Sequence, residues 1–224
     1  MADIFKDFNE TLVKCRLCPR LVAHRETVVL RPPLDQERGW RKPVPGFGDP
    51  NGWLLILGLA PSPQGGNRTG RIFTGDKSAV FLMESLYTNG LCNQPYSISK
   101  EDGLKLNGCY ITAAVKCVPP KHQPTSEEAR CCINTYLVPE LDRLTNIRAV
   151  LALGKLAFDA YFMWAKTKQK EIEKKPFGHG LSYQFPFLPK IYGSYHPSPQ
   201  NTNTGKLTKE MFNHLLNKII LENK

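Results

Sequence analysis

Four short apolar runs, each ended or closely followed by glycine or proline, constrain the fold of this chain more than any other feature of its sequence. They are "WLLILGLAP" (53–61), "CYITAAVKC" (109–117), "RAVLALG" (148–154) and "LPKIYGSYH" (188–196). A continuous apolar run of this length is typical of a strand that is buried on both faces of a parallel sheet. The sequence therefore predicts four such strands.

Segments with a helical pattern separate the predicted strands. They cover residues 4–14, 77–90, 126–144 and 154–167, and a last helix follows Thr208. Alternating strands and helices predict an α/β protein, a three-layer α/β/α sandwich around a short, mainly parallel four-stranded sheet. The chain has 224 residues, which suits a single domain over 1–224.

The loops that follow three of the predicted strands carry the residues with the most chemistry. Ligands of parallel sheets bind beyond the carboxyl ends of the strands, where these loops meet. The side chains expected to converge there are Gln64, Asn67, Phe73, Asp76, His122, His196 and Asn201. An aromatic ring with a few fixed polar groups suits a planar heterocycle as ligand.

Structural roles compete with these functional ones. Asp76 precedes "KSAVFLMESL" and is equally suited to cap that helix, a contribution of about 1 kcal/mol. Phe73 alone fits a core residue, and His122 fits a solvated loop histidine as well as a ligand contact. We expect the other histidines to be structural; they are His24, His179 and His214.

The seven cysteines predict a metal centre rather than disulfides. An odd number of cysteines without a signal peptide argues against a disulfide framework. Four positions suit zinc or an iron–sulfur cluster: Cys15 and Cys18 in "CRLCPR", Cys117, and one of the adjacent pair Cys131 and Cys132. The last two are about 15 residues apart rather than a close pair, which favours iron–sulfur. Cys92 and Cys109 fit buried free thiols.

The charge balance favours a polyanionic partner. The chain has 30 Lys and Arg against 20 Asp and Glu, a net charge of +10. Neutralising phosphates releases counterions, although a merely solvated basic surface has the same composition. No apolar run approaches the roughly 20 residues of a membrane span, and "MADIFKDFNETLVKC" lacks the apolar region of a signal peptide. We expect an unsecreted protein without a membrane partner.

Seven motifs, in order along the chain, resemble those of the uracil-DNA glycosylase superfamily. They are "CRLCPRLVAHRE", "PVPGFGDP", "LLILGLAPSPQGGNRTGRIFTGD", "YITAAVKCVPP", "VLALGKLAFDA", "FGHG" and "YHPSPQNTNTG". Within the superfamily the chain resembles the iron–sulfur branch known as family 5, or type-5 uracil-DNA glycosylase. Family 4 is less similar, because it carries an acidic residue where this chain has Leu59 and an asparagine where it has Ala113.

The resemblance implies a monofunctional enzyme that hydrolyses the N-glycosidic bond of uracil in DNA, with hypoxanthine and xanthine as candidate further substrates that the sequence does not rank. The base is flipped into a pocket, where Asp76 aids water attack and His196 donates a hydrogen bond to the base. The resemblance assigns substrate binding to Gly58, Leu59, Ala60, Gln64, Phe73, His122 and Asn201. It assigns DNA binding to Arg68, Ser198 and Gln200, and Gln200 stands where related enzymes often place an apolar wedge. By analogy the protein is a prokaryotic-type monomer in the cytoplasm, associated with the nucleoid, that starts base-excision repair.

The resemblance also implies one 4Fe-4S cluster with a structural role. Its ligands would be Cys15, Cys18, Cys117 and, from the spacing in the related branch, Cys132, which makes the N-terminal segment a cluster-binding segment. Adjacent helical residues point about 100° apart, so only one of Cys131 and Cys132 faces the cluster. Two alternatives remain open: a catalytically silent iron–sulfur module that binds DNA lesions, and a zinc-stabilised RNA-binding protein.

Overall fold

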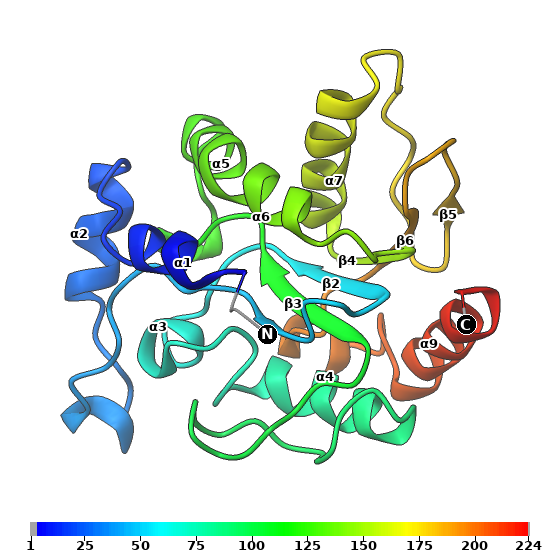
Figure 1. Cartoon of the computed structure of the whole chain (residues 1–224). Helices are drawn as coiled ribbons and strands as arrows, with labels where there is room; N and C mark the ends of the chain where they lie inside the picture. Colours follow the sequence, from blue (N-terminus) through cyan, green and yellow to red (C-terminus); the bar gives the residue numbers. More distant parts are fainter. Residues whose placement is uncertain (1–3, 224) are drawn as a thin grey trace.

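The computed structural model describes residues 4–223 and has four parallel strands at its centre (Figure 1). Their spatial order is β3 (Cys109–Ala113), β2 (Leu54–Gly58), β4 (Ala149–Leu153) and β6 (Lys190–Ser194). Two antiparallel strands of two residues each extend the sheet to six. They are β1 (Phe47–Gly48) beside β3 and β5 (Ser182–Tyr183) beside β6. The expected four strands are confirmed, and the two additions are too short to leave a periodic pattern in the sequence.

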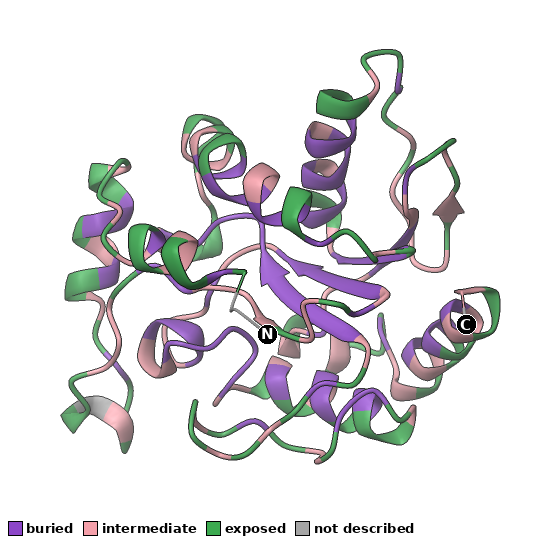
Figure 2. Ribbon diagram, viewed as in Figure 1, coloured by how far each residue is buried: buried purple, intermediate pink, exposed green. Residues whose placement is uncertain are grey.

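Alternate residues of the strands face two different helical layers, which confirms the three-layer sandwich. Leu54 and Ile56 belong to a core with α4 (Lys77–Thr88) and α9 (Lys209–Asn223). Leu55 and Leu57 belong to a second core with the α5–α6 segment and α7 (Lys155–Lys168). In Figure 1, α4 and α9 lie below the sheet, and α5, α6 and α7 lie above it. The strands β2, β3 and β4 are buried throughout, and β6 is buried except at Lys190 (Figure 2), as both-face coverage requires.

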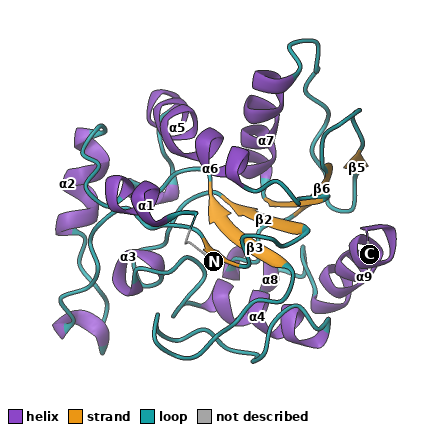
Figure 3. Cartoon of the chain, in the orientation of Figure 1, coloured by secondary structure: helices purple, strands orange, loops and turns teal. Residues whose placement is uncertain are grey.

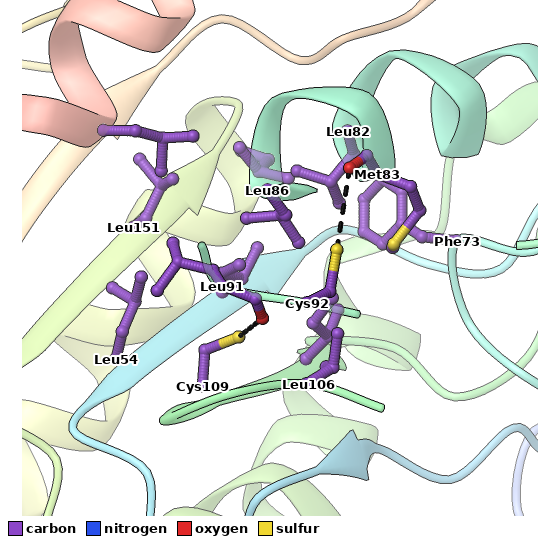
Figure 4. Close-up of a cluster of buried hydrophobic side chains, with 14 of the residues drawn as sticks. Leu54, Phe73, Leu82, Met83, Leu86, Leu91, Cys92, Leu106, Cys109 and Leu151 are labelled. Carbon is purple, nitrogen blue, oxygen red and sulfur yellow. Dashed lines mark hydrogen bonds between the residues drawn. The ribbon is translucent and has the colours of Figure 1, made fainter. Parts of the chain in front are cut away.

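Two cysteines are ordinary members of the first core (Figure 4). The Cys92 thiol lies 3.7 Å from the carbonyl oxygen of Met83, and the Cys109 thiol lies 3.4 Å from that of Leu91. Both are buried and free. They are the inert thiols that the sequence suggested.

The segment expected to be one helix over 126–144 is continuous but irregular. It begins with α5 (Ser126–Cys132), whose Thr125 and Glu128 form a capping box. A π-helical turn, η3 (Ile133–Leu137), then leads into α6 (Val138–Arg143). The wide turn precedes Pro139, which has no N–H to donate and whose ring crowds the turn before it.

The N-terminal segment is two helices that flank the C-x-x-C pair. The helix expected over 4–14 is α1 (Lys6–Leu12), and a second, α2 (Pro19–Thr27), begins at a proline directly after Cys18. Phe5 stacks on Tyr110 of β3, with ring centroids 5.3 Å apart. The segment is thus packed on the same side as α5.

Short helical turns occur in the loops (Figure 3). They are η1 (Leu34–Gln36), α3 (Gly66–Thr69), η2 (Pro120–His122) and α8 (Pro199–Thr202). The last three lie in loops that follow the carboxyl ends of strands. Between residues 4 and 223, no helix has the length and apolar character to cross a membrane.

Candidate active site

A cavity of about 750 Å³ opens where the loops after β2, β3 and β6 meet. This is the edge of the sheet where the sequence placed a ligand site. The predicted site residues that line it are Leu59, Ala60, Gln64, Asp76, His122, His196, Ser198 and Gln200. Loops far apart in the chain therefore bring a carboxylate and two imidazoles to one cavity.

Asp76 is both the N-cap of α4 and a wall of the cavity. Its Oδ1 accepts a hydrogen bond of 2.9 Å from the backbone N–H of Ala79, so the capping role is real. Its Oδ2 accepts a short hydrogen bond from the Ser62 hydroxyl. The Ser62 oxygen in turn accepts one of 3.0 Å from the N–H of Gly65. Both carboxylate oxygens are therefore held in place, and the cap does not exclude a catalytic role.

Gly65 is required for this arrangement. A Cβ at position 65 would overlap both the Asp76 carboxylate and the Ser62 hydroxyl. Any larger residue would displace one of the two groups.

His196 follows β6 and is held by the backbone of its own loop. Its carbonyl oxygen accepts hydrogen bonds of 2.8 Å from the Asn201 side-chain amide and from the N–H of Ser198. The pKa of His196 is lowered to about 4, chiefly by burial; the charge of Asp76 opposes this change and that of His122 adds to it. The imidazole is therefore neutral at pH 7 and carries one N–H donor.

Phe73 and Gly58 lie behind the cavity rather than among the residues that line it. The Phe73 ring is buried, with its centroid 5.9 Å from that of His196. A Cβ at Gly58 would come within 3.0 Å of this ring, so glycine allows the close approach. Asn201 likewise is absent from the lining and acts on the backbone of His196. These three predicted substrate contacts thus form the support of the site in this conformation.

Three non-glycine residues near the site adopt left-handed backbone conformations. They are Phe73, Lys121 and His122, with φ of +49°, +52° and +57°. Such conformations are uncommon for residues with a Cβ and tend to cluster at functional sites. The successive pair in η2 presents an exposed lysine and the cavity-lining His122 together.

Two polar residues of the loop after β2 are engaged elsewhere. Arg68 donates hydrogen bonds to the Glu37 carboxylate at 2.9 Å and to the Gln64 carbonyl oxygen at 2.8 Å. Asn67, expected at the cavity mouth, is buried and donates to the carbonyl oxygen of Arg25. Both brace the loop, and the assignment of Arg68 to DNA stays a prediction.

The structure adds lining residues that sequence reasoning missed. Val28, Val29 and Arg31 come from the proline-rich segment between α2 and β1, and the N–H of Arg31 donates to the Gln64 side chain at 3.1 Å. The composition of that segment indicated a functional loop without singling out a residue. Ser62 had no sequence signal, because a serine between two prolines is typical of any loop.

Five cysteines line one small pocket between the N-terminal helices and α5. They are Cys15, Cys18, Cys117, Cys131 and Cys132. The buried guanidinium of Arg25 donates to the Cys117 sulfur at 3.1 Å and to the Cys15 carbonyl oxygen at 2.9 Å. The N–H of Lys116 donates to the Cys132 sulfur at 3.3 Å. The cysteines that the sequence grouped are therefore neighbours in space.

Burial keeps two of these cysteine side chains in the protonated thiol form. Burial raises the pKa of Cys18 and of Cys132 to about 12, so both are thiols at neutral pH unless a cation stabilises the thiolate. Within residues 4–223, no three or more side chains of His, Cys, Asp and Glu are grouped so that they could hold a single metal ion.

Comparison with known proteins gives consistent matches. The family model "Uracil DNA glycosylase superfamily" matches residues 45–220. The type-5 uracil-DNA glycosylase of Thermus thermophilus is 48% identical over 93% of this chain and 94% of its own length. That of Pyrobaculum aerophilum is 44% identical over 95% and 90%. A type-4 uracil-DNA glycosylase of Thermotoga maritima is 25% identical over 78% and 74%.

Proposed function

The chain belongs to the uracil-DNA glycosylase superfamily, and we propose that it is a monofunctional glycosylase that removes uracil from DNA and so starts base-excision repair. The observation that carries this proposal is the cavity at the carboxyl edge of the sheet, where Asp76 and His196 meet. Enzymes that act on a base must take it out of the duplex, so uracil would be flipped into this cavity. Its volume of about 750 Å³ also has room for hypoxanthine or xanthine.

Asp76 and His196 divide the chemistry between the sugar and the base. The Asp76 carboxylate orients the attacking water, accepts its proton and stabilises positive charge on the sugar. The water oxygen bonds to C1′ while the bond from C1′ to the base breaks, and the base leaves with the electron pair. The neutral His196 donates its N–H to a carbonyl oxygen of the base as this negative charge develops. Backbone N–H groups of the 58–65 loop add to that stabilisation.

We further propose that Cys15, Cys18, Cys117 and Cys132 hold one 4Fe-4S cluster. Five thiols line one pocket, and hydrogen bonds to the sulfurs of Cys117 and Cys132 resemble those that tune cluster ligands. In a four-iron cluster each cysteine binds a different iron, so the four thiols need not meet at one ion. When bound, the cluster supplies a cross-link between the N-terminal segment and the loop after β3.

A base-release assay tests the proposed activity. We expect a uracil-containing duplex that is incubated with the protein and then treated with alkali to be cleaved more than a blank without protein. The rates of base release from duplexes with hypoxanthine or xanthine then rank these bases against uracil. Asp76→Asn keeps a capping oxygen but removes the charge, and should lower the single-turnover rate by about 100-fold or more with duplex affinity retained. Tight lesion binding without base release would instead support a silent binding module.

Iron analysis tests the cluster. The protein should be brown and contain about four irons per chain, and Cys132→Ser should lose most of the iron while Cys131→Ser retains it. If Cys131→Ser lost the iron and Cys132→Ser retained it, the fourth ligand would be Cys131. A colourless protein with one zinc would overturn the cluster.

The proposed partner is DNA that contains deaminated bases. We propose that the protein binds it as a monomer, in the cytoplasm at the nucleoid. The net charge of +10 supports a DNA partner through phosphate neutralisation. Light scattering with and without duplex tests the monomer.

A further inference from the structure

The Ser62 side chain contacts the Asp76 carboxylate directly. Its hydroxyl is partly buried, donates to Asp76 Oδ2 and accepts from the Gly65 N–H at 3.0 Å. Ser62 and its two neighbours, Pro61 and Pro63, line the cavity.

The direction of these hydrogen bonds is fixed. A hydroxyl has one proton, and because the Ser62 oxygen already accepts from a backbone N–H, its own proton is available for Asp76. The other carboxylate oxygen is held by the N–H of Ala79. Each Asp76 oxygen thus has one donor, and this pair of donors sets the rotation of the carboxylate.

The packing on the Gly65 side of this contact is tight. A Cβ at Gly65 would overlap both partners, so the hydroxyl and the carboxylate fill the space that the glycine leaves. The Asp76 carboxylate and the Ser62 hydroxyl therefore form one unit on the cavity wall.

We infer that Ser62 is a positioning residue for catalysis: its hydroxyl holds the Asp76 carboxylate so that the remaining lone pairs address the attacking water. The inference rests on the proposed function, since it presumes that Asp76 acts on that water. Ser62 itself forms no covalent bond and transfers no proton to the substrate.

The test separates rate from binding. Ser62→Ala should lower the single-turnover rate of uracil release by about tenfold or more, as expected for a lost hydrogen bond to a charged group. Its affinity for a duplex with a cleavage-resistant 2′-fluorinated deoxyuridine should stay within about twofold of the wild type, because the phosphate contacts are unchanged. Ser62→Thr keeps the hydroxyl and should recover most of the rate.

Ser85→Ala is the matched control. Ser85 is buried on α4, the helix that Asp76 caps, and its hydroxyl has no hydrogen-bond partner among residues 4–223. This variant should release uracil at the wild-type rate, and all variants should be compared for thermal unfolding.

Three outcomes decide the inference. A Ser62→Ala rate within about twofold of the wild type would overturn it. So would a rate loss matched by losses of affinity and melting temperature, since Ser62 would then only support the fold. If the wild-type chain releases no uracil, the proposed function is wrong. If only Ser62→Ala behaves unlike the expectation, the role of Ser62 is wrong and the proposed function stands.

Discussion

His196 lies where a positive charge is costly, because its half-buried ring is desolvated beside Phe73 and lies near His122. Its pKa of about 4, against an ordinary value of 6.5, means that the unfolded chain binds this proton more readily than the folded chain. Between pH 6.5 and 4, the free energy of unfolding should therefore fall as the pH falls. Above pH 6.5 both states are neutral and the effect vanishes.

NMR titration of the histidine ring protons checks this directly. The His196 resonance, identified by its absence in His196→Asn, should titrate with a midpoint near 4 in the folded protein. In urea the same residue should return to an ordinary histidine midpoint. A folded-state midpoint near the ordinary value would show that the pKa of His196 is not lowered by burial.

Single residues differ in how far the sequence could predict their place. Asp76, His122 and His196 follow strands that are plain in the sequence, and the carboxyl edge of a parallel sheet brings such loops together. Ser62 and Phe73 could not be placed, because the rotation of a loop side chain depends on tertiary contacts. The hydrogen bond to Asp76 and the stacking beside His196 exist only in the folded chain.

Among the elements, the loop after β3 and the helix α6 are joined by a fully buried ion pair. Lys116 and Glu140 are 1% and 0% exposed, and their side chains form a salt bridge. The Glu140 carboxylate also accepts from Tyr110 and Thr112. Since Lys116 precedes Cys117 and its N–H donates to Cys132, this network fixes the loop that carries the cysteines.

A double-mutant cycle tests the pair. Glu140→Leu alone leaves a buried lysine without its partner and should lower the free energy of unfolding by about 3–5 kcal/mol. Lys116→Met together with Glu140→Leu should lose clearly less than the sum of the two single variants. Urea unfolding measures all four proteins, and additive losses would show that the pair is not coupled.

The elements that could be predicted are those with a clear apolar pattern in the sequence. Four strands of five residues and helices such as α4, α7 and α9 have patterns that local sequence imposes. The edge strands β1 and β5 form through pairing with β3 and β6, so their two residues carry no period of their own. The helix α2 was missed because "PRLVAHRET" has too few apolar residues to show a stripe.

At the scale of the whole molecule, the sequence gives the net charge but not where the basic residues lie on the surface. A net charge of +10 predicted a polyanion, but only the fold shows which lysines lie near the cavity. Lys121 is exposed in the strained turn next to His122, whereas Lys105 is exposed before β3, at the opposite end of that strand from the turn.

Salt dependence of duplex binding distinguishes these two lysines. If Lys121 contacts a phosphate, Lys121→Ala should reduce the slope of log affinity against log salt by about 0.9, since one fewer counterion is released. Lys105→Ala removes the same charge and should leave the slope unchanged. Equal slopes in the two variants would show that the turn does not meet the DNA backbone.

The packing of α1 and α2 has a consequence for the order in which the chain is made. Arg20 of α2 pairs with Glu128, which is 108 residues further along, and Phe5 stacks on Tyr110. At roughly 5–20 residues per second, these helices are synthesised about 5–20 seconds before their partners exist. Both helices must therefore wait for chain made later before they can take their final positions.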